Sequence, residues 1–134
     1  MGLEIATRER EGIAVLDVKG RIVAGPETGA FREELEKLQA ASKLQVILNL
    51  AQVDFIDSTG LGAMVVTASN MKKSGGKVRL LNLNKRNIEL LVVTRLTTMF
   101  EIFDDEQDAV NSFFPDREIK TFDLLSFVKQ MKEQ

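Results

Sequence analysis

The residues whose types and spacing could do chemistry are concentrated in one short run, Asp57-Ser58-Thr59-Gly60-Leu61-Gly62. Asp57 stands where a helix N-cap is expected, so its carboxylate can accept a hydrogen bond from the free N–H of Thr59 or Gly60. Ser58 then occupies the first helical position, where its hydroxyl is expected to be exposed. The positive end of a helix favours a negatively charged group at this position.

Two glycines in the same run ask for an explanation. Gly60 and Gly62 fall within the first turns of the expected helix, where each costs about 1 kcal/mol relative to alanine unless a close approach requires it. Their presence hints that something approaches the helix. The other interpretation is a well-capped helix whose small residues pack on a neighbouring element, and the residues alone leave both open.

The composition excludes several kinds of enzyme. The chain has no Cys and no His, which removes thiol nucleophiles, disulfides, imidazole bases and the usual zinc sites. Ile56 stands where a serine nucleophile elbow needs glycine, and Val65 stands where a dinucleotide loop needs its third glycine. Asp54 and Asp57 could share a divalent cation, although a loop acid and a helix cap are the commoner use of such a pair. We therefore expect no catalytic residue, no metal and no cofactor.

Length and charge predict one ordinary globular domain. The 134 residues are 44% apolar and 28% charged, with 18 basic and 20 acidic side chains. The net charge of −2 gives no reason to expect direct binding of nucleic acid or an anionic membrane. The start lacks a secretory pattern and no apolar run could span a bilayer, so we expect a cytoplasmic protein. The acidic part is the last third, because residues 101–134 hold nine acidic and four basic side chains.

The hydrophobic pattern predicts alternating strands and helices. Glu11-Gly12 is typical of a hairpin turn between the first two strands, and Pro26 suits the first turn of a helix. Asp104, with Gln107 three residues later, predicts the start of the last helix of the domain, which Pro115 would end. The expected strands are 3–8, 13–18, 46–50, 77–83 and 100–103, the expected helices are 26–42, 58–73, 87–96 and 104–114, and 54–57 is expected to be a loop.

This order favours an α/β fold: a mixed, mostly parallel sheet with packed helices and an antiparallel entry hairpin. Residues 115–134 do not belong to the alternation. Phe122, Leu125, Val128 and Met131 predict an extra C-terminal amphipathic helix there. We expect a domain over residues 1–114 and a helical extension over 115–134. The extension could pack on the same domain or contact a partner.

At this point the sequence resembles a known family. The run from Asp57 to Gly62, preceded by Ile47-Leu48-Asn49-Leu50 and Val53-Asp54-Phe55-Ile56, is similar to the signature of STAS domains, and most closely to bacterial anti-sigma factor antagonists. The resemblance covers about residues 3 to 114 and includes the element order. Gly20-Arg21-Ile22 and Leu96-Thr97-Thr98-Met99-Phe100 also fit the family's pattern.

The resemblance implies a partner switch rather than an enzyme. In that family the serine aligned with Ser58 is phosphorylated by an anti-sigma factor, which is an ATP-dependent serine kinase. The unmodified antagonist binds the kinase and frees a sigma factor, and a serine phosphatase reverses the modification. Thr59 is the second choice of acceptor. The implied partner-binding residues are Asp57, Ser58, Thr59, Gly60, Leu61 and Gly62, with Asp57 close to the partner's nucleotide site.

A second interpretation keeps the fold and changes the role. Relatives with this fold also occur as scaffolds in stress-sensing assemblies, in lipid-transport complexes and as cytoplasmic tails of anion transporters. The intact Ser58 and Thr59 favour the phosphorylated branch, whereas the extension after Pro115 keeps the scaffold alternative open. The sequence does not identify the sigma factor, the kinase, the phosphatase or a small ligand, and it does not indicate the oligomeric state.

Overall fold

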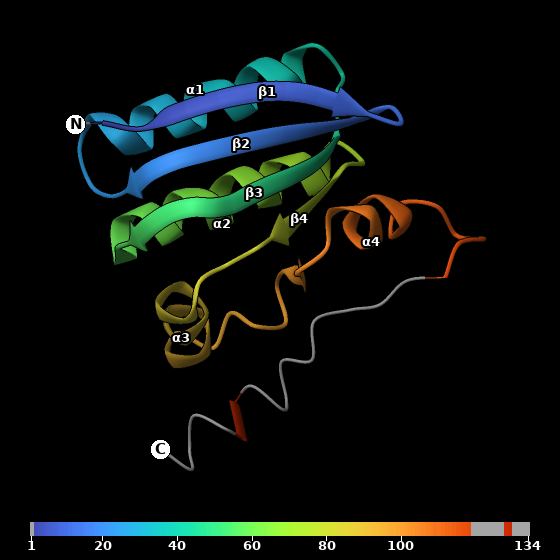
Figure 1. The fold of residues 1–134 in the computed structure, drawn as a ribbon. Helices are drawn as coiled ribbons and strands as arrows, with labels where there is room; N and C mark the ends of the chain where they lie inside the picture. Colours follow the sequence, from blue (N-terminus) through green and yellow to red (C-terminus); the bar gives the residue numbers. More distant parts are fainter. Residues whose placement is uncertain (1, 119–127, 130–134) are drawn as a thin grey trace.

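A computed structural model describes residues 2–118 and 128–129, and Figure 1 shows its fold. The elements follow one another in the predicted order. The first strand leads directly into the second, and a helix follows each strand from the second to the fifth. Their bounds are β1 (Glu4–Arg10), β2 (Ile13–Ile22), α1 (Pro26–Ala40), β3 (Gln45–Ile56), α2 (Ser58–Lys73), β4 (Lys77–Leu81), α3 (Lys85–Val93), β5 (Glu101–Phe103) and α4 (Glu106–Asn111).

The five strands form one sheet in the order β1-β2-β3-β4-β5. β1 is antiparallel to β2, and the four strands from β2 to β5 are parallel to one another. The predicted α/β architecture with an antiparallel entry hairpin is therefore confirmed. Glu11 and Gly12 form the hairpin turn with φ values of 52° and 83°, the positive pair that matches the twist of a two-residue hairpin.

Helices cover both faces of the sheet, but unequally. Figure 1 shows α1 and α2 behind the sheet and the short α4 in front of it. The alternation in β2 follows this division, because Leu16 and Val18 belong to the larger core under α1, α2 and α3, whereas Ile13 and Val15 belong to a smaller core under α4. The strand is buried on both faces, as a central strand of a parallel sheet should be.

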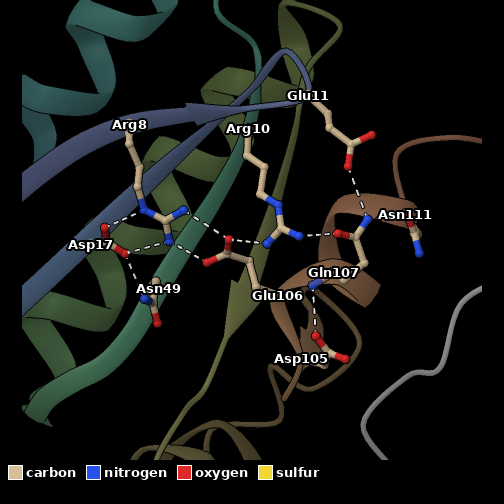
Figure 2. Close-up of polar contacts among 9 residues, drawn as sticks. All are labelled: Arg8, Arg10, Glu11, Asp17, Asn49, Asp105, Glu106, Gln107 and Asn111. Atoms are coloured by element: carbon tan, nitrogen blue, oxygen red, sulfur yellow. Dashed lines mark hydrogen bonds and ion pairs between the residues drawn. The ribbon is translucent and has the colours of Figure 1, made fainter.

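The smaller core is closed at its rim by a polar network between β1 and α4, which Figure 2 shows. Arg8 and Arg10 both form ion pairs with Glu106, and Arg8 Nε also lies 2.7 Å from Asp17 Oδ2. These arginines lower the pKa of the Glu106 carboxyl to about 2. Arg10 also donates to the side chain of Gln107. The first strand and the last described helix are therefore joined by charge.

The predicted loop over residues 54–57 was wrong for three of its four positions. β3 continues to Ile56, and its last residues pair with β2, with Phe55 opposite Arg21 and Ile56 opposite Ile22. The apolar run at 46–50 marked only the fully buried half of this strand. In its second half only Val53 and Ile56 are buried. The extension of both strands carries the start of α2 beside the end of β2.

Two other helices begin at different residues than predicted. α3 starts at Lys85 rather than Asn87 because Asn84 is its N-cap, and the preceding strand ends at Leu81 rather than Leu83. The predicted cap Asp104 was wrong, since Asp105 caps α4 and accepts from Gln107 N at 2.9 Å. α4 ends at Asn111, and the bonds Phe113 N to Val110 O and Phe114 N to Asn111 O continue as turns toward Pro115.

The C-terminal extension falls largely outside the described residues. The predicted amphipathic face with Phe122, Leu125 and Met131 lies there, so the boundary after residue 114 stays a prediction. Arg117, near the end of the described part, forms an ion pair with Glu11 at 2.9 Å and stacks on Phe114 at 3.9 Å. Over the described ranges, no helix is long and apolar enough to cross a membrane.

Candidate functional site: the N-terminus of helix α2

Ser58 is the first residue of α2 and follows directly on the carboxyl end of β3. Its side chain is exposed, as predicted, and so is that of Thr59. β3 lies in the centre of the sheet between β2 and β4. A central strand therefore places the Ser58 hydroxyl at the carboxyl end of the parallel strands, where loops and helix N-termini meet. This end of the sheet is a common place for binding sites in α/β folds.

Asp57 joins two chain segments at this edge. Its Oδ1 accepts from Gly60 N at 2.7 Å, which confirms the predicted N-cap, and its Oδ2 accepts from Ala24 N at 3.0 Å. Its own N–H donates to Ile22 O at 3.2 Å. The hydrogen bonds from Gly60 and Ala24 lower the pKa of the Asp57 carboxyl below its usual value. The carboxylate therefore fixes the loop after β2 against the first turn of α2.

The two glycines of the run have different surroundings. A Cβ atom added at Gly60 would lie 1.9 Å from Ile22 O, so the close approach that the sequence indicated is an internal one. At Gly62 an added Cβ would meet nothing within 4 Å. Packing within the described chain therefore explains Gly60 and leaves Gly62 without an internal reason.

Some of the predicted partner-binding residues are exposed, and the others are buried beneath them. Ser58, Thr59 and Gly62 are exposed and Asp57 is half-buried, whereas Gly60 is buried and the Leu61 side chain is only 3% exposed. Leu61 lies in the core under α1 and α2. Only the exposed members can offer atoms to a partner, and the buried two hold the helix end in place.

Sequence reasoning missed two asparagines that secure the other side of this edge. Asn84 Nδ2 donates to Val53 O and Asp54 O, both at 3.2 Å, and Asn87 Nδ2 donates to Val53 O at 3.1 Å. Asn87 is 1% exposed, and its Oδ1 has no hydrogen-bond partner among the described residues. Both side chains hold α3 against the end of β3. Asn84 could have been found by its position as an N-cap, since asparagine is a preferred residue there.

Charged groups flank the site on the surface. The Arg86 guanidinium lies 4.6 Å above the ring of Phe55, two residues before Asp57. Asp54 lines a depression of about 350 Å³ together with Gly20 and Arg21. Both oxygens of Asp57 are used by backbone N–H groups. The arrangement offers an exposed hydroxyl on a fixed helix end.

The sequence comparisons identify the family. A model of the STAS domain matches residues 4–109, which is most of the chain. The anti-sigma-B factor antagonist of Bacillus subtilis is 32% identical over 104 residues, which cover 76% of this chain and 92% of that protein. This relative is named for an activity on an anti-sigma factor.

Solved structures agree with the observed fold. An anti-sigma factor antagonist from Mycobacterium paratuberculosis superposes with a TM-score of 0.71 at 21% identity, covering 82% of this chain and 92% of that one. SpoIIAA of Bacillus in its phosphorylated form gives a TM-score of 0.64 at 15% identity, covering 82% and 99%. The two likenesses show the same fold. The match of the STAS domain model over residues 4–109 places this chain in the STAS domain family.

Proposed function

We propose that this protein is an anti-sigma factor antagonist that acts as a phosphorylation-controlled partner switch. In its unmodified form it binds an anti-sigma factor that is a serine kinase, and a sigma factor is released. The kinase transfers the γ-phosphate of ATP to Ser58 Oγ, ADP leaves and the hydroxyl proton is lost. The phosphorylated form no longer binds, and a serine phosphatase restores the unmodified protein.

The single observation that carries this proposal is the exposed Ser58 hydroxyl at the first position of α2, directly after the fixed Asp57. Asp57 bonds to Gly60 and Ala24 rather than to Ser58. The hydroxyl is therefore accessible to a kinase, while the backbone on which it stands is held from both sides.

Phosphate at this position would change binding without unfolding the domain. It adds about −1.5 to −2 charges, which the N-terminal dipole and free N–H groups of α2 can accommodate. A partner surface that packs against Ser58, Thr59 and Gly62 would have to desolvate the phosphate. It would also face the negative charge of the phosphate in addition to that of Asp57. The likeness of this chain to the phosphorylated form of SpoIIAA supports the first point, because that relative keeps this fold with its phosphate in place.

The test measures binding and phosphate transfer with the anti-sigma factor kinase encoded in the same genome. Ser58→Ala should bind the kinase as the unmodified protein does and accept no phosphate, whereas Ser58→Asp should bind at least tenfold more weakly. Thr59→Ala is the matched control and should still be phosphorylated at Ser58, as read by mass spectrometry of the modified peptide. Ser58→Asp that binds as tightly as the unchanged protein would refute the switch.

Copurification from the native host, with mass spectrometry of the purified chain, separates the scaffold alternative. A scaffold of a stress-sensing or transporter-associated complex should copurify with its assembly from the native host and carry no phosphate on Ser58 or Thr59 in any growth condition. Phosphate on Ser58 together with a kinase bound to the unmodified fraction supports the switch.

A further inference from the structure

A second concave surface lies on α2, beyond the Ser58 end. Its volume is about 340 Å³, and it runs between the C-terminal half of α2, the start of β4 and the loop that enters β5. At 1.5 Å per helical residue, Ser69 is about 16 Å along α2 from Ser58. We call this surface the α2–β5 groove, and the lining residues that matter here are Ser69, Lys72, Lys77, Arg79, Thr98 and Met99.

The charged side chains that line the α2–β5 groove are all positive. Its lining includes three cations and neither Asp nor Glu. Arg79 is already engaged, because its Nε lies 3.2 Å from Glu101 and its guanidinium lies 5.2 Å from the ring of Phe113. Lys72 and Lys77 are exposed, and neither forms an ion pair with another residue of the described part. Two ammonium groups therefore remain available to a ligand.

The α2–β5 groove also has an apolar side. Met99, which lines the groove, is 41% exposed and is among the few large apolar side chains that the described surface exposes. Met99 belongs to the run Leu96–Phe100 that resembles the family pattern, in which Phe100 is buried in the core. A flexible thioether adapts its shape to an apolar partner group.

We propose that the α2–β5 groove docks an acidic segment of a partner protein that carries an apolar side chain. Carboxylates of the segment pair with Lys72 and Lys77, its apolar side chain packs on Met99, and the hydroxyls of Ser69 and Thr98 offer hydrogen bonds to its backbone. Two free ammonium groups beside an exposed methionine match such a segment better than a nucleic acid, which is held by many phosphate contacts in a row.

This docking is independent of the switch at Ser58. The α2–β5 groove shares no residue with the exposed surface at Ser58, Thr59 and Gly62. At 1.5 Å per helical residue, Lys72 is about 21 Å along α2 from Ser58. This distance exceeds the Debye length at physiological ionic strength, so salt screens Lys72 from a phosphate on Ser58. A partner bound in the groove therefore stays attached in both phosphorylation states, and this property separates the inference from the proposed function.

The test uses the full chain, labelled with ¹⁵N, and a defined probe. The probe is a blocked hexapeptide of four alternating Glu and Asp residues and two Leu residues, and the comparison ligands are the same peptide with Lys at the acidic positions, inorganic phosphate and a single-stranded oligothymidine. The acidic peptide should shift the amide signals of residues 68–79 and 98–99 in a saturable way, and added salt should weaken its binding.

The variants make the test specific. Charge reversal at both free lysines, Lys72→Glu with Lys77→Glu, should weaken binding of the acidic peptide about tenfold, since two exposed pairs are lost and two repulsions appear. Lys73→Glu with Lys43→Glu makes the same change of charge outside the groove and should weaken it less than threefold. Met99→Ala leaves every charge unchanged and should weaken binding about threefold. It replaces the double charge reversal as the test variant if that variant does not fold.

Several results would overturn the proposal. They are saturable shifts centred outside the groove, equal effects of the two lysine pairs, no binding of the acidic peptide, or tighter binding of oligothymidine or phosphate than of the peptide. Ser58→Asp should bind the peptide as the unchanged protein does. If Ser58→Asp loses the kinase but keeps the peptide, both proposals stand. Retained binding of the kinase would refute the switch alone, and loss of the peptide would refute the independent docking alone.

Discussion

Gly60 and Ile22 are in contact through their backbones, because an added Cβ at Gly60 would lie 1.9 Å from the carbonyl oxygen of Ile22. The same oxygen accepts from Asp57 N at 3.2 Å. The end of β2 therefore faces the first turn of α2 with no room for a side chain. The position of Ser58 depends on this approach as well as on the cap.

The first prediction compares Gly60→Ala with Gly62→Ala. The Cβ at position 60 would push against backbone, so unfolding in urea should show a loss of about 1–3 kcal/mol. At position 62 the space is open and the residue is helical, so alanine should stabilise by about 0.5–1 kcal/mol. A partner that packs closely on Gly62 should nevertheless bind Gly62→Ala more weakly. Equal stabilities of the two variants would contradict the contact with Ile22.

The second prediction concerns the two hydrogen bonds of the Asp57 carboxylate. Asp57→Ala should lower the free energy of unfolding by about 1–2 kcal/mol, because the helix loses its cap and the loop at Ala24 loses its acceptor. Asp57→Asn keeps one acceptor oxygen and should lose less. Phosphorylation that is lost while the free energy of unfolding is unchanged would instead assign Asp57 to recognition of the partner.

The pH dependence of Asp57 follows from the direction of its shift. Its pKa is lowered in the folded state, so its contribution is complete above the pKa of the unfolded chain, about 3.9, and is lost as the pH falls further through the folded value. Stability measured from pH 5 downward should therefore fall more steeply for the unchanged protein than for Asp57→Asn.

The third prediction concerns Glu106, which joins α4 to β1. Glu106→Gln should lower the free energy of unfolding by about 1 kcal/mol at pH 7, a modest value because the arginines are partly exposed. The pKa of Glu106 is lowered to about 2, so this difference should persist down to about pH 4.5 and vanish as the pH approaches 2.

A matched control is available on the same helix. Asp108→Asn removes a carboxylate from the first turn of α4, and Asp108 has no ion pair within the described residues. We expect it to change the free energy of unfolding by less than Glu106→Gln does. Chemical denaturation of both variants at pH 7 and pH 3 checks this prediction, and a difference at pH 3 as large as that at pH 7 would contradict it.

The sequence was sufficient for the order of the elements and for the cap at Asp57. Apolar residues at a spacing of three and four define α2 from Ser58 to Lys73 as predicted, and the apolar run at 46–50 marks a buried central strand. Asp57 could be placed because a cap depends on residues only three positions away. Each of these patterns depends on residues that are close together in the sequence, so it can be recognised from a single chain segment.

What depends on distant segments could not be predicted. The second half of β3 is extended because β2 pairs with it, and the partner residue on β2 is 34 residues earlier in the sequence in both Arg21–Phe55 and Ile22–Ile56. The contact of Gly60 with Ile22 and the bond of Asp57 to Ala24 have the same origin. A glycine at position 60 indicated in the sequence that something approaches the helix. Only the fold shows that the approaching segment is the end of β2.

The order of the strands has a consequence for how the chain can be assembled. Each strand pairs with the strand that precedes it in sequence, so no strand has to enter between two that are already paired. A chain that leaves the ribosome from its N-terminus can therefore extend the sheet one unit at a time, with only the connection from the preceding strand to close at each step. The Arg8 and Arg10 pairs with Glu106 do not follow this order. They join the first strand to a helix made almost a hundred residues later, and they can form only when synthesis of the domain is nearly finished.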